Sequence, residues 1–152
     1  MWEFLNLPMP PSDNRLTVSF IRRGKMMRAS TPEAKVYKAS MEAWALENRL
    51  LLMAARRALK PHQMLSVYFK FEFPRHDLWT LKNTPKRLDC ANRIKASADA
   101  LSRALEIDDA HFFRVSAVKC LGAMRSVSAY IEVYAPIGER DPSNRFSPET
   151  SD

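Results

Sequence analysis

The most regular hydrophobic pattern in the sequence is an alternation of apolar and polar positions over residues 64–73. Five apolar side chains would share one face of an extended chain: Leu65, Val67, Phe69, Phe71 and Phe73. Successive side chains of a strand point to opposite faces, so this period of two predicts a strand with one buried face.

Shorter segments of similar character predict further strands. Residues 4–7 form a short strand that ends at the prolines that follow, because proline cannot donate to a ladder. Residues 16–20 and 26–29 are expected to pair as a basic hairpin around Arg23-Gly24-Lys25. Residues 112–120 and 126–134 are two more predicted strands, joined by a turn at Gly122.

Two segments have the apolar spacing of helices. The first begins at Ser30 or Thr31, a hydroxyl cap followed by Pro32 and Glu33, and it ends before Pro61. Its expected apolar face carries Val36, Met41, Trp44, Leu51 and Leu52. In the second segment, residues 91–105, the apolar side chains recur at intervals of three and four: Ile94, Ala98, Leu101 and Leu105.

The order strand, hairpin, helix, strand, helix, strand, strand predicts an α+β fold. A length of 152 residues suits a single compact domain with one core, which we expect to span residues 1–136. Residues 137–152 hold few apolar side chains and are expected to form a disordered C-terminal tail.

Charge adds a first indication of the partner. Lys and Arg outnumber Asp and Glu by 24 to 17, a formal charge of +7, which favours a polyanionic partner unless the surface is simply positive. Cys90 and Cys120 are isolated, so neither a zinc site nor a disulfide framework is expected. We expect neither an export signal nor a membrane anchor, and therefore a cytoplasmic protein.

Carboxylates stand at both ends of the second predicted helix. Asp89 precedes it, Asp108 and Asp109 follow it, and Lys95 lies one turn inside it. Carboxylate oxygens are ligands that Mg²⁺ prefers, and a lysine could stabilise charge on a phosphodiester during hydrolysis. Each residue also has an ordinary interpretation: Asp89 as a helix cap, Lys95 and Asp99 as a solvated pair, and Asp108-Asp109 as a polar turn.

Two basic segments are candidates for contacts with phosphates, which would position DNA without reading its sequence. The hairpin and its approach carry Arg15, Arg22, Arg23, Lys25 and Arg28, and the loop after the alternating strand carries Arg75, Lys82, Lys86 and Arg87. Phe20 and Trp79 could stack on bases, although core packing is the more common role of such aromatic side chains.

Two segments resemble the RusA family of Holliday junction resolvases. Residues 7–15, Leu-Pro-Met-Pro-Pro-Ser-Asp-Asn-Arg, are similar to the family's Leu-Pro-x-Pro-Pro-Ser-x-Asn-Arg opening, and Tyr37 falls where the family tends to carry a helix tyrosine. Residues 89–95, 99–101 and 108–110 are similar to its Asp-x-Asp-Asn-x-x-Lys, Asp-Ala-Leu and Asp-Asp-Ala-Gln series. With the strand pattern, the likeness extends over roughly residues 4–134.

The resemblance implies a site and a partner. Asp89 and Asp109 would bind Mg²⁺, with Mn²⁺ as a possible substitute and Asp108 as a further ligand candidate; Lys95 would be catalytic and Asn92 would support the site. The implied fold is a mixed sheet packed against two main helices. The implied substrate is branched DNA, cut by a homodimer because a four-way junction has two-fold symmetry. Such a protein would be encoded by a bacterium or a bacteriophage.

One position departs from the family pattern. Ala91 stands where the motif has its second aspartate, and alanine supplies no ligand. Asp108, Asp77 or Glu72 could replace that carboxylate, the enzyme could work with fewer, or the protein could bind junctions without cutting them.

We therefore expect a Mg²⁺-dependent endonuclease that resolves branched DNA in recombination or repair. The alternatives are a weakened or inactive junction-binding protein and an RNA-binding accessory domain, which the positive charge would also allow.

Overall fold

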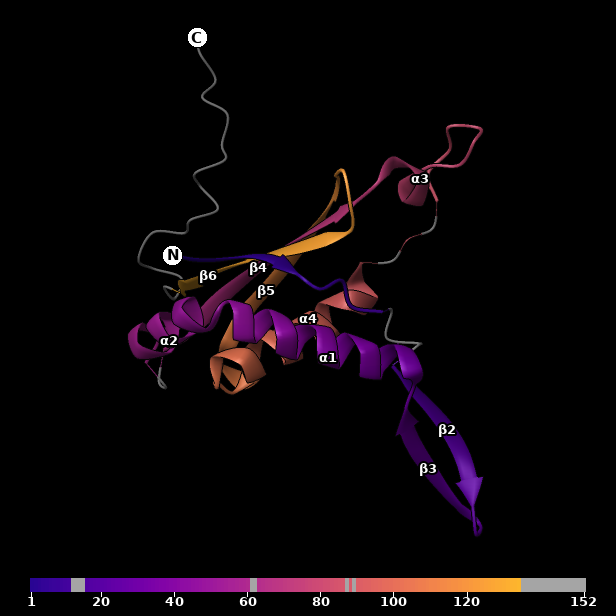
Figure 1. The fold of residues 1–152 in the computed structure, drawn as a ribbon, viewed down its shortest axis with the longest axis horizontal. Coiled ribbons are helices and arrows are strands. Elements are labelled where there is room, and N and C mark those ends of the chain that lie inside the picture. The colour runs from indigo at the N-terminus through magenta and orange to yellow at the C-terminus, as the bar shows by residue number, and fades with distance from the viewer. Residues whose placement is uncertain (12–15, 61–62, 87, 89, 135–152) are drawn as a thin grey trace.

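The computed structural model describes residues 1–11, 16–60, 63–86, 88 and 90–134. Its main sheet has the strand order β1-β6-β4-β5 (Figure 1), with β1 at Trp2–Leu7, β6 at Ser126–Val133, β4 at Leu65–Phe73 and β5 at Phe112–Leu121. Only β4 and β5 run parallel, so the sheet is mixed. The predicted positions of these four strands are confirmed.

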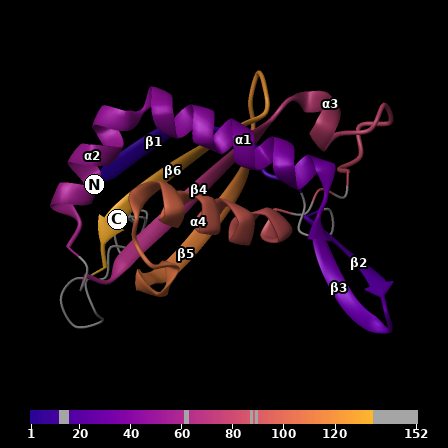
Figure 2. The same cartoon turned by 60° about the horizontal axis from the view of Figure 1, so that its bottom comes forward.

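Three helices cover one face of the sheet (Figure 2): α1 at Pro32–Glu47, α2 at Arg49–Ala58 and α4 at Ala91–Leu105. The α+β fold and the helix over residues 91–105 are confirmed. The first predicted helix is divided in two at Asn48, whose side-chain amide donates a hydrogen bond to the Trp44 carbonyl at 2.9 Å. An amide side chain that bonds to a backbone carbonyl in this way competes with continued helix, so α2 starts in a new direction.

The start of α1 follows from its sequence. The Thr31 hydroxyl accepts a hydrogen bond from the Ala34 N–H at 3.1 Å, Pro32 occupies the first turn, and Glu33 lies at the positive end of the helix dipole. Met41 and Trp44 are buried as expected, whereas Val36 is 66% exposed and does not belong to the core.

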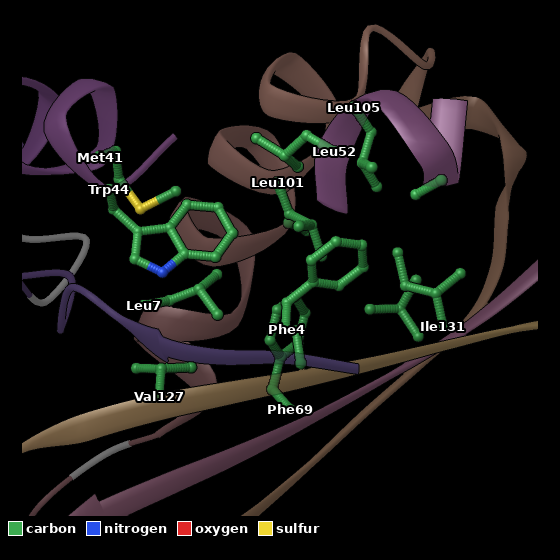
Figure 3. Packing of buried hydrophobic residues seen from close by; sticks show 14 of the residues in the cluster. Phe4, Leu7, Met41, Trp44, Leu52, Phe69, Leu101, Leu105, Val127 and Ile131 are labelled. Carbon is green, nitrogen blue, oxygen red and sulfur yellow. The ribbon is translucent and has the colours of Figure 1, made fainter. Parts of the chain in front are cut away.

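The core lies between the sheet and the helices (Figure 3). All five apolar side chains of β4 that alternate in the sequence are at most 1% exposed. Leu101 and Leu105 of α4, Leu52 of α2 and Phe4 of β1 converge on this layer, and the Trp44 indole donates to the Leu5 carbonyl at 2.9 Å. Burial of these side chains is the main force that fixes α4 on the sheet.

Two projections leave this body at one end (Figures 1 and 2). One is a separate two-stranded hairpin, β2 at Thr17–Arg22 paired with β3 at Lys25–Ser30, as predicted. The other is the segment after β4, which contains the short helix α3 at Arg75–Leu78 where only a loop was expected. Across the described residues, no helix is both long enough and apolar enough to span a bilayer.

The expected tail over residues 137–152 and the end of the domain at residue 136 lie outside the described residues.

Leu101 offers a direct test of this packing. Leu101→Ala should lower the free energy of unfolding by about 2–5 kcal/mol, because it removes buried methyl groups and leaves a cavity. Leu46→Ala on α1, where the leucine is 71% exposed, should change it by less than about 0.5 kcal/mol. Urea denaturation of both variants measures the difference, and equal losses would contradict the proposed role of Leu101 in the core.

Candidate active site

An open hollow of about 330 Å³ lies between α4 and the first half of β5. Its lining combines one face of α4 with the segment that leads into β5: Ala91, Ile94, Lys95, Ala98, Asp99, Asp109, Phe112 and Val115. The five helix residues follow the spacing of three and four that places side chains on one helix face. The structure therefore brings together Lys95 and Asp109, two of the candidates from the sequence.

Asp99 is the third charged residue of the hollow, and the sequence argument did not treat it as part of the site. Its position four residues after Lys95 is the signal that could have found it, because residues four apart lie on one helix face. Lys95 and Asp99 do not form the solvated pair that this spacing allows. No ion pair within 4.0 Å joins Lys95, Asp99 or Asp109 to another side chain in the described part of the chain.

The neighbouring acids Asp108 and Asp109 have different positions. Asp108 caps the short helix η2 at Asp109–His111, where its carboxylate accepts a hydrogen bond from the Ala110 N–H at 3.0 Å. Asp109 instead lines the hollow. The structure therefore separates these two candidates, and of the pair only Asp109 lies at the hollow.

A hydrogen bond from β5 holds the segment before α4 at Leu88. The Lys119 ammonium group on β5 donates a hydrogen bond to the Leu88 carbonyl at 3.2 Å. The N-cap of α4 is Cys90, although the sequence allowed Asp89 this role. Asp89 and Arg87 lie outside the described residues, and Asn92 is described only in its backbone, within α4.

Two of the three carboxylates offered as substitutes for the missing aspartate at position 91, Asp77 and Glu72, form contacts elsewhere. Asp77 accepts two hydrogen bonds from the Arg125 guanidinium, at 2.5 and 2.8 Å, and this contact lowers the pKa of Asp77. Glu72 pairs with Lys70 at 2.9 Å and accepts from the Ser126 hydroxyl at 3.1 Å, and both contacts lower the pKa of Glu72. Neither acid lines the hollow.

Contacts with α4 also position the surrounding elements. The Tyr37 hydroxyl of α1 donates to the Ala96 carbonyl at 3.5 Å, and burial raises the pKa of Tyr37. The Arg93 guanidinium donates to the Pro10 carbonyl and lies 5.8 Å from the centre of the Phe73 ring. The segment that leads into the hairpin is thus attached to the same helix that carries Lys95.

The basic candidates occupy the two projections. Arg22, Arg23, Lys25 and Arg28 are exposed on the hairpin, and Arg15 lies outside the described residues. In the second projection Lys82 is exposed, whereas Lys86 donates to the His76 carbonyl at 2.7 Å and Arg75 to the Asn83 side chain at 2.8 Å. Two basic side chains of this loop, Arg75 and Lys86, therefore stabilise the conformation of the loop itself.

The residues of the hollow suit Mg²⁺. This ion takes one or two carboxylates and completes its octahedron with water and phosphate oxygens, and Asp99 and Asp109 supply two carboxylates in a solvent-open hollow. Within the described residues, no three His, Cys, Asp or Glu side chains form a ready-made metal cluster. Asp89, the other acid of the family motif that the sequence singled out, lies outside the described residues.

A basic α+β domain with a hollow lined by carboxylates and a lysine has the features of a nuclease. The family model for endodeoxyribonuclease RusA matches residues 10–134, which is most of the chain. The protein therefore belongs to the RusA family of endodeoxyribonucleases, as the sequence motifs indicated. The chain matches none of the curated proteins with which it was compared.

The different positions of Asp108 and Asp109 yield a matched test of metal binding. Asp109→Asn should weaken binding of Mn²⁺, used as a paramagnetic probe, by at least about tenfold because it removes a carboxylate from the hollow. Asp108→Asn should leave it nearly unchanged, since asparagine also caps helices well. Electron paramagnetic resonance titration gives both affinities, and a larger loss in Asp108→Asn would reverse the assignment.

Proposed function

We propose that the protein is a Mg²⁺-dependent endonuclease that resolves Holliday junctions or related branched DNA in recombination and repair. The observation that carries this proposal is the hollow in which Lys95, Asp99 and Asp109 meet, at a domain with two basic projections. Membership of the RusA family supports the cleavage of DNA, and the motifs quoted above favour a branched substrate.

Each residue has a proposed part. Asp89 and Asp109 hold Mg²⁺, for which Mn²⁺ can substitute, and Asp99 supplies the carboxylate that Ala91 lacks. A bound Mg²⁺ polarises the scissile phosphodiester and lowers the pKa of a bound water. Lys95 stabilises the negative charge that develops on the phosphoryl oxygens, and Asn92 supports the site.

Basic side chains of the two basic segments of the sequence hold the DNA through its phosphates: Arg15, Arg22, Arg23, Lys25, Arg28, Lys86 and Arg87. We propose that the protein works as a homodimer, because two symmetric nicks in a four-way junction need two sites related by a two-fold axis.

A second candidate function is a junction-binding protein that cuts weakly or not at all. Ala91 favours it, since this residue lines the hollow at the position where the family motif supplies an aspartate. Both candidates predict tight binding to branched DNA and differ in cleavage. An RNA-binding accessory domain would instead bind structured RNA in preference to a junction.

Cleavage of a labelled four-way junction tests the proposal. The wild-type protein should nick the junction symmetrically with Mg²⁺ but not with EDTA, and should spare a linear duplex of the same sequence. Lys95→Ala should lower kcat by about 100-fold or more while the Kd for the junction stays within about threefold, because the lysine acts on charge that develops in the transition state.

Tight binding to the junction without nicks in the wild type would favour a junction-binding protein that does not cut. A preference for structured RNA would favour an RNA-binding accessory domain. An unchanged kcat in Lys95→Ala would make Lys95 a surface residue.

Ala91→Asp tests the weakened-site question separately. Residue 91 is exposed, lines the hollow and lies in the first turn of α4, where a carboxylate is favoured by the helix dipole. Because Asp99 is proposed to supply that carboxylate, the variant should need no less Mg²⁺ than the wild type for half-maximal cleavage. Half-maximal cleavage at a lower Mg²⁺ concentration in the variant would show that the native site lacks a ligand. A wild-type enzyme that already saturates at low Mg²⁺, with no gain in the variant, would show that Asp99 or another acid fills the role.

A further inference from the structure

The β2–β3 hairpin is built as a free-standing arm. Its twelve strand residues are all exposed, and both views show it extending away from the sheet and helices (Figures 1 and 2). Arg23 and Gly24 form the tip with φ values of 51° and 72°, the positive φ that a tight two-residue hairpin turn requires. The Thr31 N–H donates to the Leu16 carbonyl at 3.1 Å and closes the base.

Both faces of this arm carry apolar side chains near the tip. Phe20 pairs with Met27 on one face, and Ile21 pairs with Met26 on the other. Phe20 and Met27 are 41% and 43% exposed, and Ile21 and Met26 are 76% and 75% exposed. Core packing, the more common role for an aromatic side chain, is therefore the wrong interpretation for Phe20. A two-stranded ribbon with apolar side chains on both faces is poorly stable in water alone, which favours a partner that covers it.

The charge of the arm indicates which partner. Arg22, Arg23, Lys25 and Arg28 lie on it, and residues 16–32 contain no acidic side chain. In the described part of the chain, none of the four takes part in an ion pair. Four cations around two apolar pairs complement a ligand with phosphates outside and flat apolar surfaces inside, which is the chemistry of unstacked nucleic acid.

The two-sided arrangement distinguishes DNA from a protein surface. A single flat protein surface would cover one face of the ribbon and leave the opposite apolar pair in water. The open centre of branched DNA has base pairs on both sides of an inserted element. Isoleucine, methionine and phenylalanine are side chains that other proteins insert between base steps.

We propose that the β2–β3 arm enters the open centre of the branched DNA, with Phe20–Met27 and Ile21–Met26 each covering exposed bases. The four cations hold the surrounding phosphates. This inference rests on the proposed function and assigns to the arm the preference for branched over linear DNA. Arg93 links the proline segment ahead of the arm to α4, so insertion at the centre places the DNA beside the hollow.

The test compares two double variants with a matched control. Ile21→Ser with Met26→Ser removes one apolar pair, and Phe20→Ser with Met27→Ser removes the other. The control is Leu46→Ser with Leu50→Ser, which replaces two leucines that are 71% and 76% exposed on α1 and α2, away from the arm. All three proteins keep the charge of the wild type, and none of the changes lies in the core.

The probe is a four-way junction with 2-aminopurine at the centre, because unstacking raises the fluorescence of this base. Wild-type protein and control should increase the signal and prefer the junction to a linear duplex. Each arm variant should lose most of the signal and about tenfold of the junction preference, while its affinity for linear duplex stays within about twofold. Met26→Leu, which retains an apolar side chain, should behave as the wild type.

Three results would overturn the inference. Arm variants that keep both signal and preference would show that the apolar pairs do not meet bases. Arm variants that sediment as monomers while the wild type is a dimer would assign the arm to a second copy of the chain. A wild-type protein that does not distinguish junction from duplex would overturn the proposed function itself, and the insertion with it.

Discussion

The parallel pairing of β4 with β5 is the constraint on which the candidate site depends. These strands pair from Leu65–Phe112 to Phe73–Leu121, with one register shift between Leu65 and Ser66. A parallel pair cannot be joined by a tight turn, so the chain must cross over between them. That crossover contains the basic loop, residue 89, the helix that carries Lys95, and Asp109 just before β5. The candidate residues therefore all belong to the crossover that the parallel pairing of β4 with β5 requires.

One face of α4 packs in the core, and another lines the hollow. Leu101 and Leu105 are buried against the sheet and fix the helix, whereas Lys95 and Asp99 line a hollow open to solvent. Charged groups in an open hollow keep their water and need no buried partner, so the stability of the fold does not depend on neutralising them. The carboxylates remain available to a divalent ion that keeps water in its own coordination shell.

Selectivity for branched DNA would then come from the projections, and cleavage of the DNA from the hollow on the sheet and helices. A two-stranded arm outside the core can vary its apolar tip at little cost to the fold, because burial of β4 and α4 supplies most of the stability. The contact between α4 and the segment ahead of the arm also bears on where bound DNA would lie. The Arg93 guanidinium joins the proline segment, which precedes the arm in the chain, to the helix that carries Lys95.

Much of the molecule can be predicted from local sequence. The alternation in β4, the spacing of Leu101 and Leu105 in α4 and the hairpin at Arg23-Gly24 depend on residues close together in the chain. So do the family motifs that identify the chain as a member of the RusA family. The break at Asn48, the different positions of Asp108 and Asp109 and the place of Asp99 in the hollow were decided by tertiary structure. Periodicity is a local property, but which strand pairs with β4, and hence which carboxylates meet, depends on the long-range burial of apolar side chains.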